Sequence, residues 1–245
     1  MSEYNNFYGY DLNVAEQTGK ANTTLAFSSV VNKVYVWMTM ALVLTGLTAY
    51  YVAGNESLLY SIIGSRAVLL GMLIGEIALV WILSANIMRM SFPVAGIMFG
   101  LYSILNGATL SVILLAYTME SVATTFFVTA GTFGAMSLVG AFIKKDLSGM
   151  GRFLMMALIG LVLGTIVNIF VASTTFSWVL TYVGIILFCG LTAYDTQKMK
   201  DILRASANLG DQNLLKIALM CSLSLYLDFV NLFLYLLRIF GNRRS

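Results

Sequence analysis

The sequence predicts an all-α integral membrane protein, a seven-transmembrane-helix bundle with a central last helix that carries a polar stripe. Apolar residues make up 59% of the 245 residues and charged residues 10%, against roughly 45–50% and about 25% in soluble globular proteins. Seven apolar segments have the ~20 residues that a helix needs to cross a hydrocarbon core of roughly 30 Å. Short connections join these segments, which makes successive helices antiparallel neighbours.

The predicted spans are, in order, residues 34–53, 67–88, 93–117, 121–143, 153–173, 176–197 and 214–240. The third begins at Pro93, the only proline, and proline fits the first helical turn because no amide hydrogen is needed there. Residues 1–32 are polar and lack the apolar stretch of a signal peptide. We therefore expect a flexible cytoplasmic tail over 1–32, a transmembrane domain over 33–241 and a short basic C-terminal tail over 242–245.

Three spans contain two glycines four residues apart, a spacing that lets helix backbones approach closely in lipid. The pairs are Gly71 with Gly75, Gly96 with Gly100, and Gly160 with Gly164. We interpret them as packing positions within the bundle.

The positions of lysine and arginine predict a cytoplasmic N-terminus, because loops rich in these residues stay in the cytoplasm. Ten of the 14 then lie inside and four outside. The four outer residues are Arg66, Arg238, Arg243 and Arg244. Three of them lie at the C-terminus, so a last segment that re-enters and leaves the C-terminus in the cytoplasm stays an alternative.

Several kinds of chemistry are excluded by composition. The chain has no histidine, which excludes sites that need an imidazole base or metal ligand. Cys189 and Cys221 lie inside apolar spans and are predicted to be packing residues. The cations lie at the ends of spans and not in one patch, so we expect no nucleic-acid partner. No cofactor is predicted.

Three carboxyl groups lie at membrane depth, where a charge is costly and marks an ion path, a relay or a partner. Glu76 lies midway along the second span, Asp195 near the inner end of the sixth and Asp228 deep in the seventh. The alternatives without a functional role are that Asp195 is a helix-end carboxylate that reaches the headgroups and that Asp228 is a structural hydrogen-bonding group. The spacing leaves open whether the two aspartates meet.

The last span has polar residues three or four positions apart, which places them on one helical face. They are Cys221, Ser224, Asp228, Asn231, Tyr235 and Arg238. A polar face must turn away from lipid. The pattern therefore predicts a central helix that lines a solvated cavity or a buried hydrogen-bond network.

Arg89 ends the second span on the same side as Asp195. Its guanidinium is suited to bind a buried carboxylate, so one hypothesis makes Arg89 a latch that holds Asp195 at an inner gate. The other makes it an anchor that reaches the lipid headgroups.

These segments resemble bacterial members of the Bax inhibitor family, also called the transmembrane Bax inhibitor motif family. The resemblance rests on AYDTQKMK, LSLYLDFVNLFLYLLRIFG, KKDLSGMGRF and the span with Glu76, and runs from about residue 34 to 241. It implies a pH-sensitive calcium leak in the bacterial inner membrane. Asp195 and Asp228 would be its pH sensor and would bind Ca²⁺ transiently. The resemblance also implies Glu76 and Arg89 as supporting or gate groups. To these we add, as supporting polar residues, Asn231, Ser224 and Tyr194.

Two close carboxylates titrate as a unit, and in their ionised form they offer hard oxygen ligands to Ca²⁺. We therefore expect a cation conductance that changes between about pH 6 and 8. The expected partners are lipid, Ca²⁺ and protons. The main alternative is a non-transporting regulator that binds a membrane protease, a stress-response partner or another membrane protein through the tail.

A further alternative is an intramembrane aspartyl protease, which also uses two aspartates at membrane depth. The second aspartate lies in YLDF and not in a GxGD turn, and the one proline is too far upstream to form a PAL motif. We therefore predict that the protein is not an enzyme.

Overall fold

The computed structural model describes residues 3–206 and 210–243, and for residues 3–27 the backbone alone. This part of the chain forms eight helices. They are α1 (Glu3–Ala53), α2 (Glu56–Ile63), α3 (Arg66–Asn86), α4 (Phe92–Leu115), α5 (Met119–Phe142), α6 (Ser148–Val171), α7 (Thr174–Ala205) and α8 (Asp211–Phe240).

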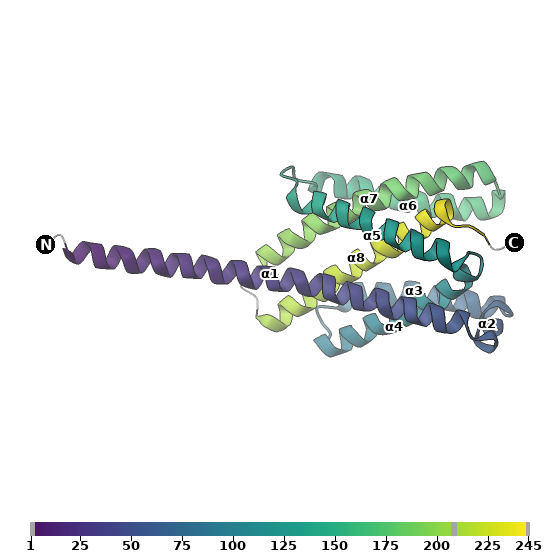
Figure 1. Ribbon diagram of the computed structural model, residues 1–245, viewed down its shortest axis with the longest axis horizontal. Helices are drawn as coiled ribbons and strands as arrows, with labels where there is room; N and C mark the ends of the chain where they lie inside the picture. The colour runs from purple at the N-terminus through teal and green to yellow at the C-terminus, as the bar shows by residue number, and fades with distance from the viewer. Residues whose placement is uncertain (1–2, 207–209, 244–245) are drawn as a thin grey trace.

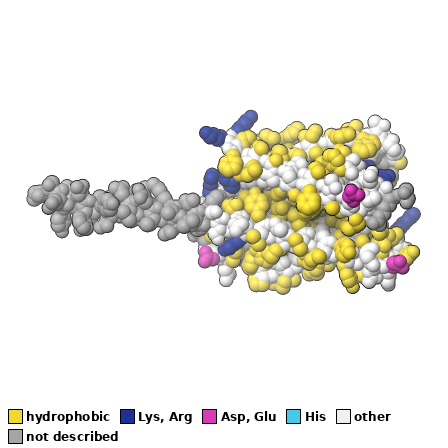
Figure 2. All heavy atoms as spheres, viewed as in Figure 1, with side chains coloured by type: hydrophobic (Ala, Val, Ile, Leu, Met, Phe, Trp, Pro, Cys, Tyr) yellow, Lys and Arg dark blue, Asp and Glu magenta, His cyan; other side chains and the backbone are white. Residues whose placement is uncertain are grey.

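Seven of these helices, all except α2, are long and apolar enough to cross a membrane. The predicted seven-helix bundle is therefore confirmed. Figure 2 shows hydrophobic side chains over the middle of the bundle and most lysine and arginine side chains gathered toward its ends. The short α2 lies in the connection after the first span, where Asn55 caps it by accepting a hydrogen bond from the Leu58 amide.

The ends of two spans differ from the prediction. α6 begins at Ser148 and not at residue 153, and α7 ends at Ala205 and not at residue 197. The predicted limits stop at the first cations, but long cationic side chains reach water while the helix continues. The 32 residues of α7 give a length of about 48 Å at ~1.5 Å per residue, well beyond the hydrocarbon core.

The helix α1 starts before the first span. Its backbone is helical from Glu3, so it continues through most of the segment predicted as a tail. Figure 1 shows this part projecting from the bundle. The predicted flexibility of residues 1–32 stays a prediction.

The last helix lies between two groups of three spans. α1 packs on α4 and α4 on α3, while α7 packs on α5 and α6. Figure 1 shows α8 between these two groups, and α8 contacts α1, α4, α5 and α7. In its most apolar stretch 72% of the residues of α8 are buried, against 6% for α3. The predicted central position of the last helix is therefore confirmed.

The two ends of the bundle are called here the N-side, where α1 enters, and the C-side, where α8 ends. The Thr118 amide, between α4 and α5, donates a hydrogen bond of 2.9 Å to the Asn242 carbonyl. α8 is continuous from Asp211 to Phe240, and Figure 1 shows the two termini at opposite ends. The alternative of a re-entrant last segment is therefore wrong.

The closest approaches between helices occur at glycines outside the predicted pairs. A methyl group on Gly107 of α4 would overlap the Thr45 carbonyl of α1, and one on Gly140 of α5 would overlap the Ala193 carbonyl of α7. Gly71 and Gly160, in contrast, face open space. Gly164, in one of the predicted pairs, does lie against a neighbour, since a methyl group on it would come within 2.9 Å of the Leu180 side chain. A glycine in such a pair thus marks a close contact only where its face meets a neighbouring helix.

We expect Gly107→Ala and Gly140→Ala each to destabilise the protein by about 1–3 kcal/mol, because backbone atoms in a packed core cannot move aside cheaply. Thermal unfolding of the purified protein in detergent measures the change. Gly160→Ala is the matched control and should leave the melting temperature unchanged. Equal effects for Gly140→Ala and Gly160→Ala would contradict this account of the packing.

Candidate functional site

A cavity of about 720 Å³, called here the acidic cavity, lies between α3 and α6 with α7 and α8 as its floor. Its polar lining comes mainly from α7 and α8. The lining includes Tyr194, Asp195 and Lys198 of α7, Ser224, Asp228, Asn231 and Tyr235 of α8, and Thr165 of α6. The rest is mostly apolar.

The polar stripe of α8 forms one wall of this cavity. Ser224, Asp228, Asn231 and Tyr235 all face it. Cys221 and Ser224 also line a smaller adjoining cavity of about 190 Å³, together with Asp195 and Lys198. At the C-side end of the stripe, Arg238 donates a hydrogen bond to the Ser177 hydroxyl. The predicted orientation of the stripe, toward a cavity and away from lipid, agrees with this arrangement.

Asp228 is the more deeply buried of the two aspartates, with 5% of its surface exposed. Its Oδ2 atom is buried and has no hydrogen-bond partner among the described residues. An unpaired polar atom at this depth lowers stability by roughly 1–3 kcal/mol, and by more when it is charged. Packing alone gives no reason for a carboxyl group at this position.

Asp195 is half-buried and lies nearer the N-side. Lys198, three residues further along α7, acts on it electrostatically, and the Lys198 ammonium also lies 5.7 Å from the centre of the Tyr194 ring. Lys198 was not among the predicted site residues, although its i+3 spacing from Asp195 indicates a shared helical face.

The two aspartates share this cavity although they lie at different distances from their helix ends. Asp195 and Asp228 interact electrostatically. On α8 the cavity extends from Ser224 to Tyr235, about 16 Å at ~1.5 Å per residue. Both carboxyl groups therefore border the same cavity.

The two segments AYDTQKMK and KKDLSGMGRF meet at the N-side of the cavity. Gln197 accepts a hydrogen bond of 2.7 Å from the Leu147 amide and donates one of 3.0 Å to the Lys145 carbonyl. A methyl group on Gly151 would overlap the Tyr194 ring, so this glycine leaves room for the tyrosine. Outside the membrane, hydrogen bonds from Ser148 hold the pKa of Asp146 below its usual value.

Glu76 belongs to a different polar cluster. Asn106 of α4 donates a hydrogen bond of 3.5 Å to it, and the Tyr226 hydroxyl of α8 donates one of 3.1 Å to Asn106. Tyr226 also shares a hydrogen bond of 2.7 Å with Thr45 of α1. This chain of contacts joins α3, α4, α8 and α1 on the side of α8 away from α7. Glu76 does not line the acidic cavity, whereas its neighbour Ile77 does.

Arg89 lies in the connection between α3 and α4 and is exposed. No hydrogen bond or ion pair joins it to Asp195 in the part of the chain that the structure describes. α3 ends at Asn86, so Arg89 lies beyond the helix and its side chain reaches solvent. The cation next to Asp195 is Lys198.

Comparison with known proteins gives a consistent result. A family model described as inhibitor of apoptosis-promoting Bax1 matches residues 27–245. The inner membrane protein YbhL of Escherichia coli K12 is 50% identical over 212 residues, which cover 86% of this chain and 91% of YbhL. An uncharacterized protein of Deinococcus radiodurans is 43% identical over 87% of this chain and 90% of its own length. One of Caulobacter vibrioides is 37% identical over the full length of both chains.

If the acidic cavity contains water, a thiol on its wall should react with a charged thiol reagent, because the thiolate is the reactive form and needs a polar surrounding. In a background with Cys189→Ala and Cys221→Ala, we expect Asn231→Cys to be labelled. Leu225→Cys is the control, because Leu225 is fully buried on the same helix. Labelling of the control alone, or of neither variant in folded protein, would contradict a solvated cavity.

Proposed function

The chain belongs to the Bax inhibitor-1 family, and on that basis we propose that it is a pH-sensitive, calcium-permeable leak channel or transporter. One observation carries the proposal. Two aspartates at membrane depth, Asp195 and Asp228, line one elongated cavity. Charged groups inside a bilayer are rare, and they mark ion paths and proton relays.

The groups in the cavity suit a hard cation. Ca²⁺ prefers oxygen ligands from carboxylates, amides and water. Asp195 and Asp228 supply carboxylates, Asn231 an amide oxygen and Ser224 a hydroxyl. The described residues contain no cluster of three or more acidic, cysteine or histidine side chains that could hold a metal. We infer that Ca²⁺ passes through and is bound weakly.

Protons would control this site directly. Two carboxyl groups in one cavity titrate as a coupled pair, so Ca²⁺ and protons compete for the same oxygens. The other titratable groups that line the cavity are Tyr194, Lys198 and Tyr235. Lys198 lies next to Asp195, where its ammonium would compete with a cation for the carboxylate.

We propose the bacterial inner membrane as the location, because the relative YbhL is an inner membrane protein. The N-side would face the cytoplasm. Ten of the 14 lysine and arginine residues then belong to that side, as expected for loops that remain in the cytoplasm.

The shared cavity also meets one requirement of the protease alternative, since an aspartyl protease needs two carboxyl groups at one substrate. Cleavage of a transmembrane-helix reporter that stops in both Asp195→Asn and Asp228→Asn would establish that activity. Intact reporter in the presence of folded protein removes it.

We expect calcium flux into dye-loaded proteoliposomes to change between pH 6 and pH 8, the window set by coupled carboxyl titration. Asp195→Asn and Asp228→Asn should each flatten this pH dependence, and the double substitution should add little, because coupled groups act non-additively. Asp201→Asn is the matched control, an exposed aspartate further along α7. Absence of flux from folded protein at every pH would falsify the transport proposal and favour a regulatory role.

We expect Lys198→Gln to raise calcium flux at pH 8 several-fold, because it removes the cation that competes for Asp195. A loss of ~1 kcal/mol of competing interaction corresponds to about a five-fold change. Flux measured in the same vesicles tests this. An unchanged or lower flux would show that Lys198 does not compete with the ion.

A further inference from the structure

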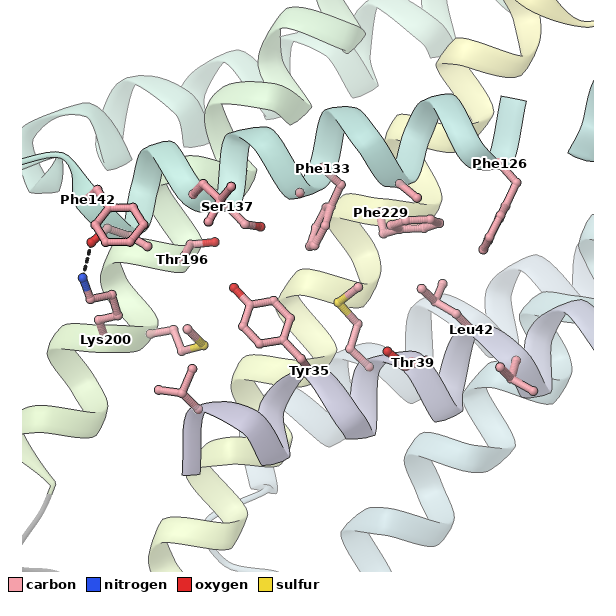
Figure 3. A pocket seen from close by; sticks show the side chains of 18 of the residues that line it. Tyr35, Thr39, Leu42, Phe126, Phe133, Ser137, Phe142, Thr196, Lys200 and Phe229 are labelled. Atoms are coloured by element: carbon pink, nitrogen blue, oxygen red, sulfur yellow. Dashed lines mark hydrogen bonds between the residues drawn. The ribbon is translucent and has the colours of Figure 1, made fainter. Parts of the chain in front are cut away.

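A second cavity lies on the opposite side of α8, between α1 and α5. It has a volume of about 980 Å³ and is called here the apolar seam. α7 and Phe229 of α8 complete its lining, and most of its surface is apolar. Figure 3 shows Leu42, Phe126, Phe133 and Phe229 along the apolar part of its lining.

The N-side end of the apolar seam is polar. Ser137 and Thr196 line it, with only 6% and 1% of their surfaces exposed. Neither hydroxyl has a hydrogen-bond partner among the described residues. Figure 3 shows both hydroxyls and that of Tyr35 turned toward the same space. Buried hydroxyls are normally paired, so two unpaired ones facing a cavity indicate an absent acceptor.

A cation lies at the mouth of the seam. Lys200 lines it and donates a hydrogen bond to the Ala141 carbonyl near the end of α5, as Figure 3 shows. An ammonium group has three donors, so two remain for a ligand. Lys144 and Lys145 follow the last residue of α5 and are exposed, which adds positive charge at the same end.

The remainder of the seam has the length and lining of a hydrocarbon chain. On α5 it extends from Phe126 to Phe142, about 24 Å at ~1.5 Å per residue, most of the ~30 Å hydrocarbon core. Near its C-side limit the rings of Phe126 and Phe229 lie 5.5 Å apart between centroids. Beyond the N-side end, Thr39 is the one lining residue of the seam with a polar side chain among the described residues, and the others are apolar residues or glycine.

We propose that the apolar seam binds an anionic glycerophospholipid from the leaflet on the N-side. The phosphate binds Lys200, the ester carbonyls accept hydrogen bonds from Ser137, Thr196 and Tyr35, and an acyl chain lies along the phenylalanines. The order of groups in such a lipid, anion then ester then hydrocarbon, matches the order of groups along the seam.

The simpler account is that Lys200 only caps α5, since a lysine near a helix C-terminus stabilises the last carbonyl groups. That account leaves the Ser137 and Thr196 hydroxyls unpaired and gives no occupant for the cavity. It predicts that Lys200→Met lowers stability without any effect on lipid preference. The lipid proposal predicts a change in preference.

Native mass spectrometry of the full-length protein in detergent tests the proposal, with phosphatidylglycerol and phosphatidylethanolamine added in parallel. We expect phosphatidylglycerol to be retained preferentially. Gly134→Phe should weaken its retention about ten-fold or more, because Gly134 lines the seam and faces open space. Gly131→Phe is the matched control, one turn earlier on α5, exposed and outside the seam lining.

Lys200→Met should abolish the preference for phosphatidylglycerol over phosphatidylethanolamine. Lys216→Met is its control, because Lys216 also donates to a backbone carbonyl at the N-side, that of Met88. If Gly134→Phe fails to fold, the pair Ser137→Ala and Thr196→Val should weaken retention of both lipids.

Equal retention of lipid by Gly134→Phe and Gly131→Phe would overturn the proposal. So would a Lys200→Met protein that melts at a lower temperature with its lipid preference intact. A dimer that disappears in Gly134→Phe without any retained lipid would overturn it as well, and would assign the seam to a second copy of the chain. None of these outcomes depends on calcium flux.

Discussion

A carboxyl group in the middle of a bilayer must be kept away from hydrocarbon, and the arrangement of this protein depends on that requirement. Asp228 lies deep in α8 and is 5% exposed. Four other spans contact α8, with α1 and α4 on one side and α5 and α7 on the other. The polar stripe thus decides which helix is central, because in lipid apolar residues give no preference for the interior over the bilayer.

Packing α8 between two groups of helices leaves two cavities beside it, the acidic cavity and the apolar seam, and their linings differ in chemistry. Asp195 and Asp228 line the acidic cavity between α3 and α6, whereas Thr196 and Phe229 line the apolar seam between α1 and α5. These are sequence neighbours on α7 and α8 that point to opposite sides. An occupant of the apolar seam therefore packs against the same helical turns that position the two carboxyl groups.

Where α8 packs against α1 and α4, the helices are in close contact and leave no such cavity around Tyr226 in the described part of the chain. Tyr226 is fully buried and its hydroxyl joins Thr45 and Asn106, while Gly107 lets α4 approach the Thr45 carbonyl of α1. Close backbone contact and a hydrogen-bonded side chain thus occur together, which fixes α8 against the α1 and α4 pair. At the acidic cavity and the apolar seam, in contrast, the helices on the two sides are not in close contact, so they have room to move there.

The sequence by itself determined the seven spans, the central last helix and its polar face, because composition and a 3.6-residue period act locally along the chain. It also identified both aspartates, since a charge in an apolar run is visible without a neighbour. Only the tertiary structure decided that the two share a cavity, that Glu76 belongs with Asn106 and Tyr226 instead, and that Arg89 lies exposed beyond the end of α3. These facts depend on helix tilt, on rotation about each helix axis and on where each helix ends. Packing between residues far apart in the sequence decides these three properties of each helix.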